Sequence, residues 1–307
     1  MSSVLYDAPG PKARARSRVI SVVGLVVVLV LLAWLVWALG APKASANGAV
    51  QPGMWDITRW DVFSDRQVWL ALGKGVLATL QMAGVAAVLA LTLGVVFSFG
   101  RSADHKAIRI PTTIILEFVR GLPVLLMMLF ILLVFATGAY WAGVAALGLY
   151  NGAIIGEALR AGIQSLPRGQ REAGLAIGLT PLSTRFRIEF PQAFRQMLPI
   201  IIAQLVVLLK DTSLAFIVGY GELLREGVRN LPNFFGERYQ FSFFLVVLAI
   251  YLAMNMSLSW FARFIARRSG PKAGKLVVDP LAPEPIPDTS LSVGAGTGAD
   301  AGGGDSR

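Results

Sequence analysis

The chain of 307 residues carries a formal net charge of +10, yet only 15% of its residues are charged and 55% are hydrophobic. A water-soluble domain normally has about 25% charged residues, so this composition excludes an ordinary soluble protein. Cysteine is absent from the sequence, which excludes disulfides, thiolate metal sites and a cysteine nucleophile.

The sequence contains six apolar runs that are each long enough to cross a hydrocarbon core about 30 Å thick. The first run, residues 19–39, follows a basic stretch and precedes Ala44-Ser45-Ala46, as a signal peptide would. We interpret it as an anchor helix because the apolar part of a signal peptide has only about 7–15 residues. The other five runs cover residues 72–99, 112–136, 139–158, 196–219 and 240–264. The predicted fold class is an all-α polytopic membrane protein with about six transmembrane helices.

The Lys and Arg residues indicate how the chain is oriented in the cell membrane. Four precede Val19, three lie in segment 101–109 and six lie in segment 160–195, whereas segments 41–70 and 220–239 hold three each. This asymmetry predicts cytoplasmic N- and C-termini. Because the basic residues are spread over separate loops and tails rather than one face, nucleic-acid binding is not predicted.

The spans divide the chain into regions with different expected roles. Residues 1–18 form a basic cytoplasmic tail, and residues 40–71 form an external segment. A transmembrane core covers residues 72–265 and includes a long cytoplasmic loop at 159–195. The tail at 266–307, rich in Pro and then in Gly, Ala and Asp, is expected to be disordered.

The cytoplasmic loop 159–195 is unusually long for a connection between spans, which indicates structure of its own. Pro167 and Gly178 are placed to begin and end a first helix, with Gly178 as a left-handed cap. Thr180 and Pro181 begin a second helix, which we expect to stop at Pro191.

Motifs in this loop resemble a known family. Glu172-Ala173-Gly174 is followed at the family's spacing by Gly178 and then by Ile188-Glu189-Phe190-Pro191, which resembles the EAA signature of ABC importer permeases. Gly174 and Phe190 depart from the usual alanine and leucine. The resemblance implies a type I importer core of five helices plus the N-terminal one, and a coupling helix that docks into a groove of an ATPase. The residues implied to dock are Gln170, Glu172, Ala173, Gly174, Ala176 and Gly178.

Further motifs narrow the resemblance to the polar amino-acid branch of these permeases. They lie at residues 117–123, 157–163, 169–172 and 210–214, and the start of the chain, residues 4–12, resembles permeases of actinobacterial glutamate importers. The resemblance implies glutamate as the amino-acid substrate. The implied partners are two ABC ATPase subunits, a second permease of related or identical sequence, and an extracellular substrate-binding protein.

The chain itself is predicted to catalyse no reaction and to bind no cofactor. Its nearest approach to a phosphate-binding loop, residues 270–275, is one residue short and is followed by Leu276 where a hydroxyl must hold magnesium. ATP and magnesium are therefore expected on the partner ATPases. No metal site is predicted either, because the single histidine, His105, has no companion ligand.

Charged residues inside the predicted spans are candidates for the transport pathway, because charge is costly in a bilayer. Lys210 and Asp211 fall near the middle of the fifth span, where at least one is expected to line the substrate path. An internal ion pair that orders the bundle is the other interpretation. Thr212 and Ser213 are expected either to contact substrate or to bond to their own helix.

Glu117 and Arg120 lie one helical step apart early in the third span. They are interpreted as a gate or as an ion pair at the permease interface, with Gly121 and Pro123 bending the helix. Gly148, Gly152 and Gly156 recur every fourth residue in the fourth span, a spacing that permits close helix packing.

Two alternative functions remain open at this point. A secondary amino-acid transporter driven by an ion gradient would also place charges such as Lys210 and Asp211 inside the membrane. A membrane-embedded enzyme has little to work with in a chain that has one histidine and no cysteine.

Overall fold

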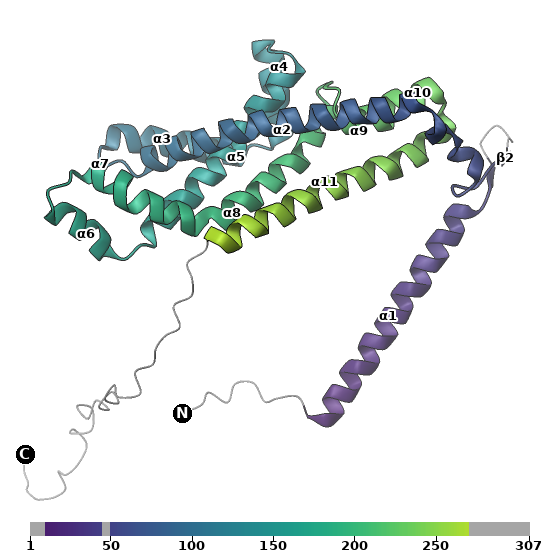
Figure 1. Ribbon diagram of the computed structural model, residues 1–307, viewed down its shortest axis with the longest axis horizontal. Helices are drawn as coiled ribbons and strands as arrows, with labels where there is room; N and C mark the ends of the chain where they lie inside the picture. Colours follow the sequence, from purple (N-terminus) through teal and green to yellow (C-terminus); the bar gives the residue numbers. More distant parts are fainter. Residues whose placement is uncertain (1–9, 45–49, 270–307) are drawn as a thin grey trace, which may run out of the picture. The chain divides into compact units, whose positions relative to one another are not determined.

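The computed structural model describes residues 10–44 and 50–269, which are almost entirely helical (Figure 1). Most of the two predicted tails, residues 1–9 and 270–307, lies outside the described residues. The elements and their bounds follow in chain order: α1 (Pro11–Gly40), β1 (Lys43–Ala44), β2 (Val50–Gln51), η1 (Ile57–Arg59), η2 (Asp61–Ser64), α2 (Arg66–Arg101), α3 (Lys106–Gly121), α4 (Val124–Phe135), α5 (Ala139–Gln164), α6 (Arg168–Ala176), α7 (Pro181–Thr184), η3 (Arg185–Glu189), α8 (Phe190–Asp211), η4 (Thr212–Phe216), α9 (Leu223–Arg225), η5 (Glu226–Asn230), α10 (Leu231–Phe235), η6 (Glu237–Tyr239) and α11 (Gln240–Ser269).

Among the described residues, five helices are long and apolar enough to cross a membrane. They cover residues 12–40, 66–101, 139–164, 181–216 and 237–264, and a bent helix pair at 106–135 raises the number of spans to six. The predicted all-α membrane fold is confirmed. Most helices begin earlier than expected: α1 starts at Pro11 inside the predicted basic tail, and α2 starts at Arg66 inside the predicted external segment.

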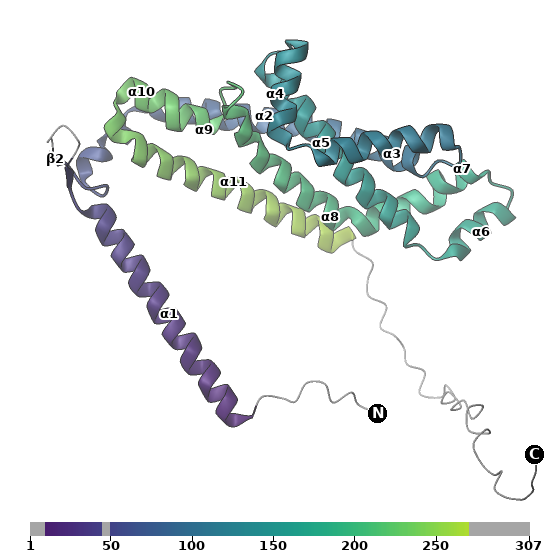
Figure 2. The same ribbon diagram turned by 180° about the vertical axis from the view of Figure 1, so that it is seen from behind.

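The core of the bundle lies between α2, α5, α8 and α11, which run alongside one another in both views (Figures 1 and 2). The glycine spacing in α5 explains how closely α5 approaches α2. A Cβ atom added at Gly148 would lie 2.5 Å from a Leu89 methyl carbon, and one at Gly156 would lie 2.9 Å from Phe97 Cβ and 3.0 Å from the carbonyl oxygen of Gly94. The predicted packing role of these glycines is confirmed.

The third predicted span, 112–136, is not one straight helix. It is divided into α3 and α4, whose axes differ by 105° across the break at Leu122 and Pro123 (Figure 1). Pro123 accounts for the break, because the ring disfavours a helical conformation of the preceding residue, and Leu122 is extended with φ −92° and ψ 134°. The sequence located the bend but underestimated its size.

The expectation that the second loop helix stops at Pro191 is wrong. The chain stays helical from Pro181 to Phe216, and Pro191 lies in the first turn of α8. The π-helical turn η3 precedes it, with the Phe190 N–H bonded to the Arg185 carbonyl. Pro191 has no N–H to donate inside this continuous helix, and the wider turn before it relieves the clash that a proline ring causes inside a regular helix.

Helix α1 differs from the other spans because its apolar side chains are exposed along the whole helix. Its end contacts the segment that follows it, where Trp55 Nε1 donates to the Val36 carbonyl at 2.9 Å. This segment also holds the antiparallel pair of β1 and β2, in which Lys43 is opposite Gln51 and Ala44 is opposite Val50.

Candidate coupling and transport sites

Helix α6 forms the centre of the long loop between α5 and α8 and is capped at its C-terminal end as the sequence predicted. Gly178 has φ +83°, in the left-handed region that favours glycine, and its N–H bonds to the Leu175 carbonyl. The Leu179 N–H returns to the Gly174 carbonyl at 3.1 Å. Thr180 then begins α7, with its hydroxyl accepting from the Ser183 N–H.

The six predicted docking residues point in different directions from α6. At 100° per residue, Ala173 and Ala176 share a face with Gly169, and all three are exposed. Glu172 lies on a second face with Arg168, Arg171 and Leu175, and all four line a pocket. Gly178 follows the helix and is exposed.

The remaining two residues, Gln170 and Gly174, face the rest of the loop and hold α6 in place. Gly174 is buried, and a Cβ atom added there would lie 2.5 Å from Thr184 Cγ2. Gln170 Oε1 accepts from Gln192 Nε2 at 3.1 Å. The departure from the usual alanine at position 174 therefore follows from the size of its neighbour, Thr184.

At the end of the bundle nearest α6, Arg101 connects α2, α3 and α5. Its guanidinium lies 2.8 Å from a Glu117 oxygen and 2.8 Å from a Glu157 oxygen. Glu157 also binds Arg160 at 2.5 Å. The predicted Glu117–Arg120 pair is present but longer, at 3.8 Å. The role of Arg101 was not predicted from the sequence. The spacing of Glu157 and Arg160, which places both on one helix face, was a signal that ion pairs form here.

Lys210 and Asp211 lie near the end of the span 181–216 rather than at its middle, because α8 ends at Asp211 and tightens into the 3₁₀ turn η4. The two side chains form no ion pair with any described residue. Lys210 is exposed in a groove of about 620 Å³ along α11, which it shares with Tyr251, Asn255 and Arg263. Asp211 is half-buried outside that groove's lining.

The hydroxyl groups after this pair bond to their own helix. Thr212 Oγ1 donates to the Leu209 carbonyl at 2.7 Å and is buried, and Ser213 Oγ donates to the Lys210 carbonyl at 2.9 Å. Ser213 still lines the groove beside Lys210.

A buried carboxylate, Glu222, was not predicted from the sequence. It follows the span that ends at Phe216 and is 0% exposed. Its oxygens accept from the N–H groups of Leu224 and Arg225, both at 2.8 Å, and from the Tyr251 hydroxyl at 2.5 Å. Burial raises the pKa of Glu222, whereas these hydrogen bonds lower it. The only sequence signal was an acidic residue before a short apolar run.

Among the described residues, no group of three or more His, Asp or Glu side chains is arranged to hold a metal ion. The candidate spans pack closely through glycines, and a long loop between two of them contains capped helices. These features define a multi-pass all-helical membrane protein.

Comparison with known proteins identifies its family. The family described as binding-protein-dependent transport system inner membrane component matches residues 90–270. The glutamate transport system permease protein GluD of Corynebacterium glutamicum is 35% identical over 76% of this chain and 88% of its own length. The probable glutamine ABC transporter permease protein GlnP of Bacillus subtilis is 33% identical over 62% of this chain and 90% of its own length.

A solved amino acid ABC transporter with histidines has a similar fold. Its TM-score is 0.61 at 26% identity, covering 68% of this chain and 98% of the solved chain. The chain therefore belongs to the binding-protein-dependent permeases, within the branch that serves polar amino acids. It is an inner-membrane permease subunit of an ABC importer, a subunit type that carries no ATPase domain and works with an ATPase and a binding protein. This assignment sets aside the ion-gradient-driven carrier and the membrane enzyme.

Proposed function

We propose that this chain is the permease of an ATP-driven glutamate importer, with α6 as its coupling helix. The similarity to the glutamate permease of Corynebacterium glutamicum, over 76% of this chain, carries the choice of substrate. The groove beside α11 supports that choice. Lys210 and Arg263 both line it, and a groove that carries cations suits an anionic amino acid.

Docking of an ATPase on α6 is supported by the exposed face of Gly169, Ala173 and Ala176. Small side chains allow another chain to approach a helix closely, and the Gly174 and Gln170 contacts fix the helix through a neighbouring face. The proposed assembly has two ATPases that hold ATP and magnesium, a second permease and an extracellular binding protein. Both termini of this chain lie in the cytoplasm, as the distribution of Lys and Arg predicts.

ATP closure of the two ATPases would move α6 and shift the spans between inward-facing and outward-facing states. In this scheme the permease alternates between two states that bind substrate differently, and ATP supplies the free energy. Lys210, and not the buried hydroxyl of Thr212, is the residue of the 210–213 segment that we assign to the substrate path.

The test is uptake of labelled glutamate by liposomes that contain this chain with its partner subunits and binding protein. We expect uptake that requires hydrolysable ATP and is blocked best by unlabelled glutamate, with glutamine, aspartate and arginine as competitors. Lys210→Gln should weaken uptake, whereas Lys74→Gln, a matched change in the external half of α2, should not. ATP-dependent uptake blocked best by glutamine or arginine would reject glutamate while leaving the importer assignment intact.

A further inference from the structure

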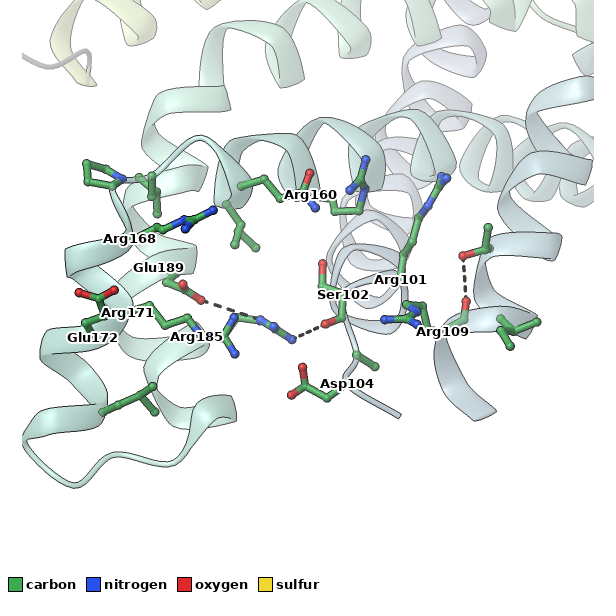
Figure 3. A pocket seen from close by; sticks show the side chains of 18 of the residues that line it. Arg101, Ser102, Asp104, Arg109, Arg160, Arg168, Arg171, Glu172, Arg185 and Glu189 are labelled. Carbon is green, nitrogen blue, oxygen red and sulfur yellow. Dashed lines mark hydrogen bonds and ion pairs between the residues drawn. The ribbon is translucent and has the colours of Figure 1, made fainter. Parts of the chain in front are cut away.

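A cytoplasmic pocket of about 860 Å³ lies between the coupling helix and the ends of the spans (Figure 3). The turn after α2, helix α3, the end of α5, helix α6 and the turn η3 all contribute to its wall. Six arginines line it: Arg101, Arg109, Arg160, Arg168, Arg171 and Arg185. None of the residues assigned to the substrate groove reaches it, so glutamate transport does not explain this pocket.

The lining carries more positive than negative charge. Against its six arginines stand only three carboxylates, those of Asp104, Glu172 and Glu189. Arg101 and Arg160 are neutralised by Glu117 and Glu157 behind the wall. Arg109, Arg168 and Arg171 form no ion pair with any residue that the structure describes. The pocket therefore has unpaired guanidinium groups on α3 and on α6, at opposite walls.

Arg185 gives independent evidence that the pocket takes a ligand. The residue is only 9% exposed, and its Nη1 donates to the Ser102 carbonyl at 2.7 Å (Figure 3). Its Nε is buried and has no hydrogen-bond partner, and the nearest carboxylate oxygen, on Glu189, is 3.9 Å away. A buried donor without an acceptor is unfavourable, so the Arg185 guanidinium has bonding capacity that its protein partners leave unused, on the wall of the pocket.

We propose that this pocket binds a phosphate group. Arginine presents several N–H donors in a planar fork that matches phosphate oxygens, and the unpaired arginines come from segments far apart in the sequence. The phosphate belongs either to an anionic phospholipid of the inner leaflet or to a soluble compound. The exposed side chains of Ile110 and Ile114 line the same pocket, and such a wall suits the acyl chains beside a headgroup.

A ligand in this position would connect the coupling helix to the membrane core. Arg168 and Arg171 belong to α6, whereas Arg109 belongs to α3 and Arg185 to η3. A phosphate held by both sides fixes the coupling helix relative to α3. The inference goes beyond the proposed function because neither glutamate nor ATP is the ligand.

The experiment measures how fast phenylglyoxal modifies individual arginines in the full transporter, assembled with its ATPases in nanodiscs. Discs of pure phosphatidylcholine are compared with discs that also contain phosphatidylglycerol, and with phosphatidylcholine discs in inorganic phosphate. Arg109 and Arg168 report on the pocket. Arg187 and Arg195, which line a separate small cavity of the same loop, are the internal control.

We expect phosphatidylglycerol to slow modification of Arg109 and Arg168 but not of Arg187 and Arg195. Protection by inorganic phosphate alone would also support the site and would assign it to a soluble ligand. The double variant Arg109→Gln/Arg168→Gln should bind phosphatidylglycerol about tenfold more weakly by native mass spectrometry, whereas Arg187→Gln/Arg195→Gln should not.

Two results would overturn the proposal. Equal protection of all four arginines would show a general attraction of cytoplasmic arginines to anionic lipid. Protection of Arg109 and Arg168 in pure phosphatidylcholine that neither phosphatidylglycerol nor inorganic phosphate increases would show that the bound ATPase, and not a phosphate group, covers the pocket.

Discussion

Gly174 shows how a single side chain limits the position of the coupling helix. We expect Gly174→Ala to destabilise the loop by about 1–3 kcal/mol, because the new methyl group would lie 2.5 Å from Thr184 Cγ2. Thr184→Ala should restore stability in the double variant, since it removes the clashing methyl. The lost hydroxyl costs little because Thr184 Oγ1 has no hydrogen-bond partner. Thermal unfolding of the purified complex measures all three variants.

The control for this pair is Gly84→Ala, at an exposed glycine of α2 outside the proposed docking face, where a new Cβ atom meets nothing within 4 Å. It should leave the unfolding temperature nearly unchanged. If Gly174→Ala unfolds at the wild-type temperature, the close packing of α6 against Thr184 is not maintained in the assembled transporter.

Glu222 makes stability depend on pH in a direction that follows from its raised pKa. The charged carboxylate is disfavoured by burial, so this residue favours the folded state most at low pH, where it is protonated. That contribution disappears as pH rises through its folded-state pKa. We therefore expect the unfolding temperature of Glu222→Gln to improve relative to wild type between about pH 4 and pH 8.

Glu226→Gln is the comparison for this measurement, because Glu226 is a neighbouring carboxylate that is only half-buried. This variant measures how much the loss of a nearby carboxylate changes the unfolding temperature while Glu222 stays in place. A difference between Glu222→Gln and wild type that stays constant over the whole range would show that Glu222 does not titrate with folding.

For single residues, the sequence predicts contacts between neighbours along the chain. It misses contacts between residues that only the fold brings together. The left-handed cap at Gly178 was predicted because helix ends have local signals. Arg101 was missed because its partners, Glu117 and Glu157, lie 16 and 56 residues away. Glu222 was missed for the same reason, since its burial depends on Tyr251 of α11.

Helix α6 offers a prediction at the scale of the element. We expect Ala173→Arg/Ala176→Arg to abolish co-purification of the ATPases, because two long charged side chains would cover the face proposed to dock. Membrane insertion should not change, since both residues are exposed in the free chain. Ala107→Arg changes another exposed alanine, in the segment 101–109 that is predicted to be cytoplasmic. It should leave the ATPases bound. Retention by both variants would place the docking surface elsewhere.

The elements themselves were mostly predictable because long apolar runs and capping residues are strong local signals. The structure differs from the predicted helices at two prolines. Pro191 was expected to end a helix, but the π turn η3 lets the helix continue through it. Pro123 was expected to bend a span, but the extended conformation of Leu122 turns the chain by 105°. A proline marks where a helix is perturbed, and tertiary packing decides how.

For the whole molecule, α1 stands apart from the rest. It precedes the residues matched by the family, and its side chains are exposed from Val19 to Trp37. We expect that replacing residues 19–39 with an unrelated apolar span will leave ATP-dependent uptake and ATPase binding within about twofold of wild type. An unrelated span preserves the topology, which a deletion would disturb.

The matched change is replacement of the same length of α5, which should abolish assembly because α5 is packed against α2 through glycines. Loss of uptake from the α1 replacement would show that α1 covers a functional surface of the assembled transporter.

The unbroken helix from Pro181 to Phe216 has a mechanical consequence. Its 36 residues form a lever about 50 Å long, with the coupling helix packed at one end and Lys210 close to the other. A tilt of about 5° at Thr184 therefore displaces the far end by about 4 Å, roughly the width of one side chain. The π turn η3 adds one residue to a turn of this helix, so it sets the angle between the end that packs against α6 and the end that carries Lys210.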